Sequence, residues 1–367
     1  MFTPPRCPNE QCEQHARPES KFFRRHGFYR AKCRSHAVPR FLCKTCGKSF
    51  SRQTFRADYH DKKPHLNARV VEFLMAGVGL RKTARTLGIG RKNLELKWRK
   101  IARHGRRLDL NLKARAARAN ARAPQSAPYR IQFDELETYE TRRNTRPLSV
   151  ATMVEVRTRL IIGVMAAPIR PRGTMTKQRL AAIAREDRLF GRRVDRSRAA
   201  CRSVFRSAAK LQPGATEVQL ESDDKRTYPG YFQDAFAAVS RSHRVTSSKA
   251  PRGVGTPLFP INLTEAVMRD HAGRVRRDSW LVSKCRTYLN QHLAFYASWK
   301  NWVLTRFNRD EYAPGVLAGM APRNLSVNEF LGWRQAWGRR SPCPFGSGAE
   351  SMLDLLGCPQ AGRLRAA

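Results

Sequence analysis

The sequence predicts an α/β protein built from several domains. Two close cysteine pairs lie in residues 1–60, and apolar residues recur at helical spacing over residues 64–104. From Tyr129 onward, strand-like apolar runs alternate with helical stretches. A chain of 367 residues favours two or three folded units, because one domain usually takes roughly 100–200 residues. The predicted domains are 1–60, 61–108 and 129–310, with a linker at 109–128 and a tail at 311–367.

The charge balance favours one class of partner and argues against others. The chain has 71 Lys and Arg against 29 Asp and Glu, a formal net charge of +42. Such an excess predicts binding to a polyanion, with DNA favoured over RNA and RNA over an anionic membrane surface. No run approaches the ~20 apolar residues of a membrane helix, and the segment from Met1 to Cys7 lacks the apolar core of a signal peptide. We therefore expect a cytoplasmic protein with reduced thiols.

The paired cysteines predict a zinc site near the amino terminus. Cys7 and Cys12 form one pair, and Cys43 and Cys46 form a second pair that Gly47 follows. Two such pairs around a β-hairpin make a zinc ribbon, in which thiolate ligands stabilise a unit too small for a large core. The residues that compete for one ligand place are His15, His26, Cys33 and His36. His15 is the strongest competitor, and Cys33 is expected to be a buried thiol.

Residues 64–104 predict a helix-turn-helix. An apolar stripe ends at the break of Gly77 and Gly79, and the small Ala84 is followed four positions later by the turn glycine Gly88. The basic run 91–100 then fits a last helix that enters the major groove of DNA. A generic three-helix unit with a solvated basic face is the alternative. The predicted DNA contacts are Arg81, Arg91, Lys92, Asn93 and Lys97.

Two segments are expected to lack a core of their own. Residues 109–128 alternate Ala with Arg and have no large apolar residue after Leu112, so we expect a basic linker that folds only on DNA. In the tail, the segment 342–367 is expected to be disordered.

Residues 129–310 predict a mixed sheet with acidic residues at strand ends. The expected elements are strands starting at Ile131, at 150–156 and at 160–166, helices within 176–211, a strand at 218–220, a helix at 231–239, a strand at 243–247 and a helical region at 262–307. Asp134 lies in the first strand, and Asp223 follows the fourth. Carboxylates delivered to strand ends can converge into a hard-oxygen site for divalent metal. On a basic surface, such a site indicates phosphodiester chemistry on nucleic acid.

This order of elements and several segments together resemble a known family. The segments are Arg40–Phe55, Phe133–Glu135, Ser222–Tyr228 and Asn262–Arg269, the last continuing into Arg277–Lys284. In this order they resemble DDE-type transposases of bacterial insertion sequences, in the branch with an amino-terminal zinc ribbon and helix-turn-helix. The resemblance covers most of residues 7–310. It implies a ribonuclease-H-like catalytic domain that cleaves DNA strands and transfers them to a target in a Mg-dependent reaction.

The resemblance also implies cofactors and partners. Two Mg²⁺ or Mn²⁺ ions would occupy each active site, beside the structural Zn²⁺ of the ribbon. The partner would be double-stranded DNA, both the terminal inverted repeats and the target, with no membrane involved. The protein would act as a homodimer or higher oligomer on DNA, in the cytoplasm and nucleoid of a bacterium.

By this resemblance Asp134 and Asp223 correspond to the first two catalytic carboxylates, with Asp224 ranked behind Asp223. The family usually has Glu as its third acid, but this chain has Asn262 at that position and Glu265 one turn later. Glu265 is favoured as the third ligand, and Asn262 is the alternative. Both residues also fit a helix-capping box after Pro260, with Asn262 as the cap.

Basic and aromatic residues follow this position. A basic stripe that could hold phosphates near the metals consists of Arg269, Arg274, Arg276, Arg277 and Lys284. A solvated helix face is the alternative for these residues. The aromatic residues expected in the core, not as base-stacking platforms, are Trp280, Tyr288, Trp299 and Trp302.

Two other functions remain open at this point. The first is a non-catalytic DNA-binding regulator descended from a transposase. The second is a ribonuclease-H-like nuclease, which would be recognised by cleavage of an RNA–DNA hybrid in place of inverted-repeat DNA.

Overall fold

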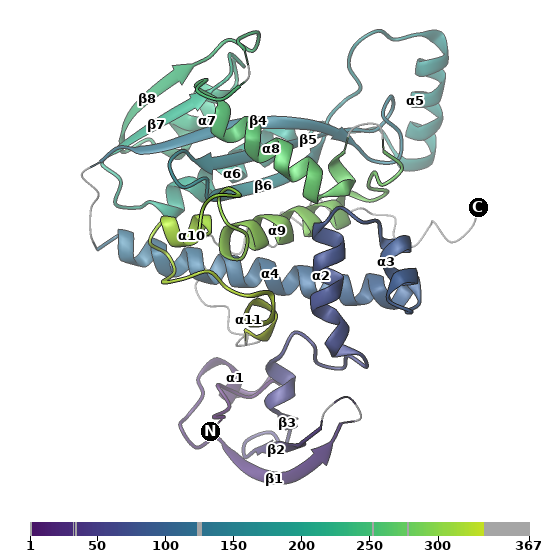
Figure 1. Cartoon of the computed structure of the whole chain (residues 1–367), viewed down its shortest axis with the longest axis vertical. Coiled ribbons are helices and arrows are strands. Elements are labelled where there is room, and N and C mark those ends of the chain that lie inside the picture. Colours follow the sequence, from purple (N-terminus) through teal and green to yellow (C-terminus); the bar gives the residue numbers. More distant parts are fainter. Residues whose placement is uncertain are drawn as a thin grey trace.

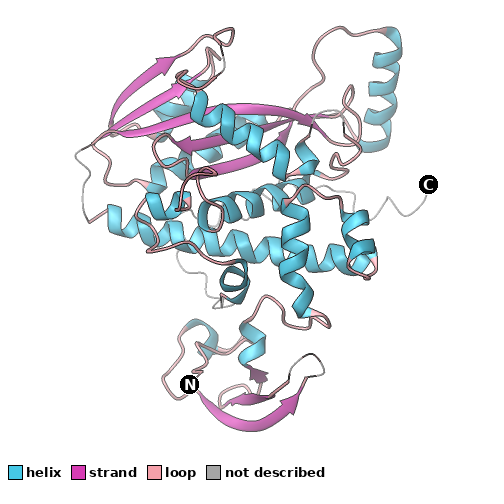
Figure 2. Ribbon diagram, in the orientation of Figure 1, coloured by secondary structure: helices cyan, strands magenta, loops and turns pink. Residues whose placement is uncertain are grey.

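The computed structural model describes residues 2–31, 33, 35–122, 127–251, 253–276 and 279–333. Over these ranges the chain forms a small amino-terminal ribbon and a larger body with a central sheet (Figure 1). Helices lie on both sides of that sheet (Figure 2). The predicted mixed α/β architecture is therefore confirmed. Among the described helices, none combines the length and the hydropathy that a membrane crossing requires.

The ribbon is a three-stranded antiparallel sheet with an aromatic core. Its elements are α1 (Glu13–Ala16), β1 (Phe23–Arg30), β2 (Ala37–Cys43), β3 (Ser49–Ser51) and the 3₁₀ helix η1 (Arg52–Phe55). Phe50 contacts the rings of Phe22, Phe41 and Phe55, with centroids 6.3, 5.9 and 6.0 Å away. A unit of this size buries little apolar surface, so its stability depends on a further cross-link.

Helices follow in the order that the sequence predicts. They are η2 (Pro64–Leu66), α2 (Asn67–Met75), α3 (Leu80–Thr86) and α4 (Arg91–Asn120). Gly77 and Gly88 end α2 and α3 with φ angles of +72° and +58°, which glycine adopts without strain. At Gly77 a Cβ atom would lie 2.5 Å from Nη2 of Arg276, so the turn after α2 packs directly on the body.

The linker prediction for 109–128 is wrong, because α4 is one helix of 30 residues that continues to Asn120. Asp109 Oδ2 forms a buried ion pair with Lys113 Nζ at 2.8 Å. Lys113 also donates to the carbonyl oxygen of Ile161 at 2.8 Å, and Trp302 Nε1 donates to Asp109 Oδ1 at 2.8 Å. Buried polar side chains therefore hold this half of α4 against the sheet and α9 in place of large apolar ones.

The body is built on a five-stranded sheet with the strand order β6-β5-β4-β7-β8. Its strands are β4 (Tyr129–Tyr139), β5 (Pro147–Glu155), β6 (Ile161–Pro168), β7 (Glu217–Ser222) and β8 (Ser240–Val245). The first three form the predicted antiparallel meander, while β7 runs parallel to β4 and β8 runs parallel to β7. The parallel pair brings two segments that are distant in sequence side by side at the sheet centre.

Helices cover both faces of the sheet. They are α5 (Lys177–Phe190), α6 (Ser197–Leu211), α7 (Tyr228–Ala235), α8 (Phe259–His271), the 3₁₀ helix η3 (Gly273–Val275) and α9 (Arg286–Trp302). The core under α6 and α7 includes Phe133 and Phe205, whereas the core under α8 and α9 includes Leu136 and Leu293. The helical region predicted at 262–307 is thus two helices separated by an irregular segment. Helix α5 has no buried residue and extends from the body (Figure 1).

The predicted units 61–108 and 129–310 share one hydrophobic core. Val70 of α2 and Trp98 of α4 belong to the same buried cluster as Leu136 of β4 and Leu293 of α9. The described part of the expected tail joins this core through α10 (Pro314–Leu317) and α11 (Val327–Gly332). Phe330 of α11 is buried, and its carbonyl oxygen accepts a 2.7 Å hydrogen bond from His104 Nε2. The segment 342–367, expected to be disordered, lies outside the described residues.

Candidate functional site

Four cysteines of the ribbon form a candidate metal centre. The Sγ atoms of Cys7, Cys12, Cys43 and Cys46 all lie within 4.8 Å of one another. Sγ of Cys7 lies 3.5 Å from Sγ of Cys46, and Sγ of Cys12 lies 3.8 Å from Sγ of Cys43. Tetrahedral Zn²⁺ with Zn–S bonds of about 2.3 Å places its sulfur ligands about 3.8 Å apart. The donor set and its spacing therefore fit a structural zinc ion, as the sequence predicts.

Two of the residues that competed for a ligand place, His15 and Cys33, do not belong to the four-cysteine cluster. His15 is buried with its Nδ1 2.8 Å from the carbonyl oxygen of Cys7, a contact that fixes the backbone of the first cysteine pair. Cys33 is exposed, so the expectation of a buried thiol at this position is wrong. It lies in the loop between β1 and β2, away from the aromatic core.

The predicted DNA-contacting residues of the helix-turn-helix separate into exposed and buried side chains. Arg81 of α3 is exposed, as are Arg91, Lys92 and Asn93 in the first turn of α4. Lys97, one turn further, is buried, and its Nζ lies 2.9 Å from Asp61 Oδ2 and 3.0 Å from Asn67 Oδ1. Lys97 therefore fastens α4 to the preceding segment, and its ammonium does not face a DNA duplex.

The parallel strand pair brings the segments of the two predicted acidic residues side by side. Gln132 of β4 and Glu221 of β7 are register partners, and Gln132 Nε2 donates to Glu221 Oε2 at 2.6 Å. Their side chains therefore share one face of the sheet. Because side chains alternate along a strand, Asp134, two residues further along β4, is directed to that same face. The register pair Phe133–Ser222 immediately precedes Asp134 and Asp223. Asp223 is the first residue after β7 ends.

The surroundings of Asp223 contain two carboxylates and the ammonium of Lys225. Burial raises the pKa of Asp223, and the neighbouring carboxylates of Asp224 and Glu135 raise it further. The backbone N–H of Lys225 donates to Asp223 Oδ1 at 3.2 Å and, together with the ammonium of Lys225, opposes this shift by lowering the pKa. Asp224 itself is exposed. Cations that approach Asp223 would relieve the repulsion among these carboxylates.

Helix α8, which carries Glu265, packs against β4 and β5 (Figure 1). Glu265 is buried in a stripe with Ile261 and Met268, and the backbone N–H of Ile261 donates to Gln132 Oε1 at 2.9 Å. The capping-box reading is wrong, because α8 begins at Phe259 and the N–H of Asn262 already donates to the carbonyl oxygen of Leu258. Asn262 is half-buried within the first turn.

The three acidic side chains are less closely gathered than the thiols. Over the described ranges, the four cysteines are the one set of three or more potential ligands whose donor atoms lie close enough to share an ion. Asp134 Oδ1 accepts a 2.7 Å hydrogen bond from the backbone N–H of Glu135. Strand pairing thus places Asp134 and Asp223 directly after the register partners Phe133 and Ser222, and α8 packs on the strand that carries Asp134.

A second polar cluster, which sequence reasoning missed, lies on the opposite face of β4. Glu135 is bonded to Lys225 Nζ, and it also accepts from Ser149 Oγ at 2.6 Å and from Tyr228 Oη at 3.1 Å. Burial alone would raise the pKa of Glu135, but these three donors lower it below its usual range. The cluster fixes the chain just after Asp223. The sequence does contain a sign of this cluster. Asp134 and Glu135 are adjacent on a strand, and adjacent strand residues face opposite sides of a sheet, so Glu135 had to lie on the other face.

The basic stripe after α8 is largely taken up by internal contacts. Arg269 is half-buried, and Arg276 bonds to the carbonyl oxygens of Arg269 at 3.2 Å and Asp270 at 2.7 Å. Arg274 donates to Ser283 Oγ at 3.2 Å, and burial lowers its pKa. Arg277 lies outside the described residues, and Lys284 is exposed.

The aromatic residues expected in the core divide in two groups. Trp302 is buried, Trp299 packs against the core, and Tyr288 lies under the guanidinium of Arg99 at 4.3 Å from its ring centroid. Trp280 is 97% exposed, so its assignment to the core is wrong. It belongs to the irregular segment between α8 and α9, where helical periodicity no longer predicts burial.

Comparison with known proteins supports the helix-turn-helix. No curated protein matches the chain. Residues 58–94 match the family described as HTH_Tnp_IS1, InsA C-terminal domain. The matched residues include α2, α3 and the first turn of α4, where Arg91, Lys92 and Asn93 are exposed. The chain therefore carries a helix-turn-helix segment similar to those of insertion-sequence transposases, which indicates DNA binding and a role related to transposition.

Proposed function

We propose that the chain is a DDE-type transposase, which binds the terminal inverted repeats of an insertion sequence, cleaves the DNA strands at its ends and joins them to target DNA. The observation that carries the proposal is the parallel register of β4 and β7, which pairs Phe133 with Ser222, the residues that immediately precede Asp134 and Asp223. Helix α8 packs against β4 and β5, and Glu265 is among its buried residues. The order of the elements in the body supports the ribonuclease-H-like fold that the resemblance implies.

The residues present suit divalent cations. Their donors are carboxylate oxygens, which Mg²⁺ and Mn²⁺ prefer. The pKa of Asp223 is raised by burial and by the carboxylates of Asp224 and Glu135, of which Glu135 is paired with Lys225, so a bound cation would neutralise mainly Asp223 and Asp224. Asp134, Asp223 and Glu265 would hold the ions, with the amide oxygen of Asn262 as the alternative to Glu265. Paired ions in such a site activate an attacking water or 3′-hydroxyl and stabilise the leaving oxygen.

The chain's own residues position these ligands and the DNA. Gln132 links β4, β7 and α8, because it bonds to Glu221, to the carbonyl oxygen of Pro257 and to the N–H of Ile261. Exposed Arg91 and Lys92 would contact phosphates of the terminal repeat, since helix residues with cationic tips neutralise the DNA backbone. The zinc ribbon would add a second contact with the duplex. Because two ends must meet before strand transfer, the active form would be an oligomer on DNA.

Strand cleavage of DNA that carries the element's terminal repeat tests the proposal. The wild-type protein is expected to nick and join this DNA in Mg²⁺, while Asp134→Asn and Asp223→Asn bind it with unchanged affinity and do not cleave it. Asp224→Asn is the matched control, because Asp224 is exposed and adjacent. Glu265→Gln and Asn262→Ala, tested separately, identify the third ligand.

Two outcomes of this experiment would reject the proposal. A wild-type protein that binds the repeat but never cleaves it would be a DNA-binding regulator. Preferential cleavage of an RNA–DNA hybrid would make the protein a nuclease of another specificity.

A further inference from the structure

A basic cavity lies at the far end of β4 from the acidic residues. It measures about 640 Å³ and is lined by the β4–β5 turn, the start of α5 and the segment 279–284. Tyr139 and Asp134 are five residues apart on β4, so the cavity begins about 17 Å from Asp134 at about 3.3 Å per residue. The cavity is therefore separate from the acidic region, and its size suits a small organic group.

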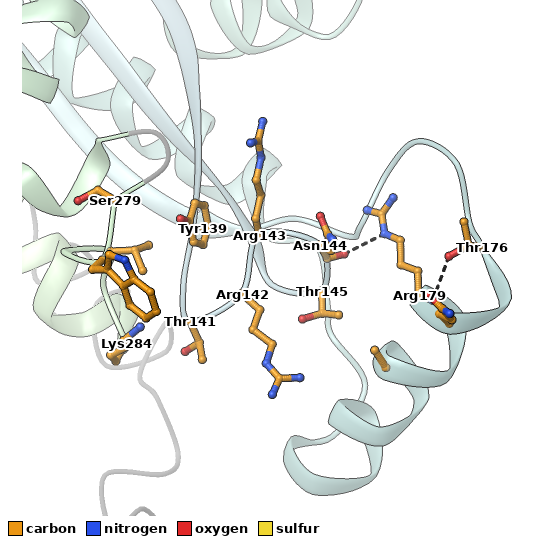
Figure 3. A pocket seen from close by; sticks show the side chains of 14 residues that line it. Tyr139, Thr141, Arg142, Arg143, Asn144, Thr145, Thr176, Arg179, Ser279 and Lys284 are labelled. Carbon is orange, nitrogen blue, oxygen red and sulfur yellow. Dashed lines mark hydrogen bonds between the residues drawn. The ribbon is translucent and has the colours of Figure 1, made fainter.

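Its wall is cationic and contains a solvent-exposed indole. The cationic lining residues are Arg142, Arg143, Arg179 and Lys284, and no acidic residue lines the cavity. Figure 3 shows Lys284 and Arg179 on opposite sides of the β4–β5 turn that carries Arg142 and Arg143. Trp280 belongs to the same wall and is 97% exposed. An exposed indole beside four cationic side chains suits a partner that has both an aromatic face and negative charge.

Backbone contacts hold this wall in place. The N–H of Thr141 donates to the carbonyl oxygen of Ser283 at 3.0 Å, which joins the β4–β5 turn to the segment of Trp280. Arg179 Nε donates to the carbonyl oxygen of Asn144 at 3.0 Å, and Thr176 Oγ1 accepts from the N–H of Arg179 at 3.2 Å (Figure 3). The cavity is thus built from three segments that are tied together around the turn.

The geometry points to a binding site for an unpaired nucleotide of single-stranded DNA, whose base stacks on Trp280 and whose phosphates contact Arg142 and Lys284. Indole faces accept any unstacked base, whereas the bases of a duplex are stacked on each other and cannot reach such a ring. The remaining lining mixes polar side chains, among them Thr141, Asn144 and Thr145, with the apolar Ala182 and Val282, and this mixture suits a nucleotide better than the acyl region of a membrane. The inference rests on the proposed function for the choice of DNA as the polyanion.

Single-stranded binding can be measured apart from catalysis. Fluorescence anisotropy of the full chain would compare a labelled single strand, a blunt duplex of the same sequence and vesicles of anionic phospholipid. Trp280→Ala is expected to weaken single-strand affinity about tenfold, the loss of one stacked base, with duplex affinity unchanged. Trp280→Phe should recover most of this loss. Arg142→Ala should lower the salt slope of single-strand binding by about 0.7.

Tyr312→Ala is the matched control, because Tyr312 is also exposed but lies outside the cavity. Unchanged single-strand affinity in Trp280→Ala would overturn the inference, as would an equal loss of duplex affinity. A loss of vesicle binding alone would assign the surface to a membrane and overturn it too. Absence of strand cleavage by the wild-type protein would contradict the proposed function and leave this result standing, since the assay needs no catalysis.

Discussion

Gln132 of β4 and Glu221 of β7 are bonded at 2.6 Å across a parallel strand pair, two residues before Asp134 and Asp223. This bond supports the strand register before the two acids, because a shift of one residue along β4 would separate Gln132 from Glu221 and turn Asp134 to the opposite face. The Gln132 amide also bonds to the loop before α8 and to the first turn of that helix. One buried side chain thus aligns all three elements that carry the acidic residues.

Gln132→Ala should therefore destabilise the body and abolish strand cleavage together. The substitution removes one donor from Glu221, which keeps its ion pair with Arg130, and leaves the buried N–H of Ile261 without its partner. We expect a loss of about 2 kcal/mol in the free energy of unfolding. Urea denaturation measures this loss. Gln219→Ala, also on β7, where the amide donates to Glu217 Oε1 of the same strand, is the matched control and should change stability by less than about 1 kcal/mol. Equal stability of the two variants would contradict the assigned role of Gln132.

The buried pair Asp109–Lys113 should account for much of the stability of α4 in its observed place. Lys113→Ala leaves Asp109 charged and buried, which we expect to cost about 3–5 kcal/mol in urea unfolding. Arg115→Ala, two residues further on the exposed side of the helix, should cost at most about 0.5 kcal/mol. Asp109→Ala combined with Lys113→Ala should cost less than the sum of the single changes. Additive losses would show that the two side chains act independently.

Acid should lower the stability of the body through protonation of His104, at pH values above those at which carboxylates titrate. Burial lowers the pKa of His104 from 6.5 to about 4, so the unfolded chain binds this proton more readily than the folded one. Stability that is present above pH 6.5 is then lost as the pH falls towards 4, by up to about 3 kcal/mol. His104→Gln should reduce the slope of this part of the profile in urea unfolding at a series of pH values, while the buried His292, whose pKa burial lowers to about 3, retains part of the slope. His65→Gln, at an exposed position, should leave the profile unchanged; a slope equal to that of the wild type in His104→Gln would refute the role of His104.

The two kinds of basic residue on α4 should respond differently to substitution. Arg91→Ala and Lys92→Ala remove exposed cations, so each should lower the salt slope of duplex binding by about 0.9 without loss of stability. Lys97→Ala removes the partner of Asp61 and should lower the melting temperature. Anisotropy titrations with duplex DNA at several salt concentrations, together with thermal melts, separate these effects. If Lys97→Ala kept the wild-type melting temperature and lowered the salt slope of duplex binding, Lys97 would have to be a DNA contact.

Short-range patterns in the sequence were sufficient to predict the metal centre and the strands of the sheet. The spacing of Cys7, Cys12, Cys43 and Cys46 fixes two knuckles that a hairpin can bring together, and the structure gathers all four. The alternation around Ile131 and Val218 predicts strands, and these strands are neighbours in the sheet. In both cases, covalent spacing or side-chain period determines the result.

Features that depend on tertiary packing could not be predicted in this way. Residues 109–120 read as a linker because alanine and charged residues carry no apolar period, yet small side chains allow close packing and Lys113 finds buried partners on β6. Lys97 and Trp280 were misplaced for a similar reason. From residue type alone, a lysine is expected to be exposed and a tryptophan to be buried. The actual burial of each side chain depends on its contacts with segments that are distant in sequence.

Asp134 and Asp223 are proposed to bind the same divalent cations. Titration of the full-length protein with Mn²⁺, followed by electron paramagnetic resonance of the free ion, tests this most directly. Asp224→Asn removes a neighbouring charge and should only weaken Mn²⁺ binding, while Asp134→Asn and Asp223→Asn should each lose the same bound ions. Mn²⁺ binding that persists unchanged in Asp134→Asn or Asp223→Asn would contradict the claim.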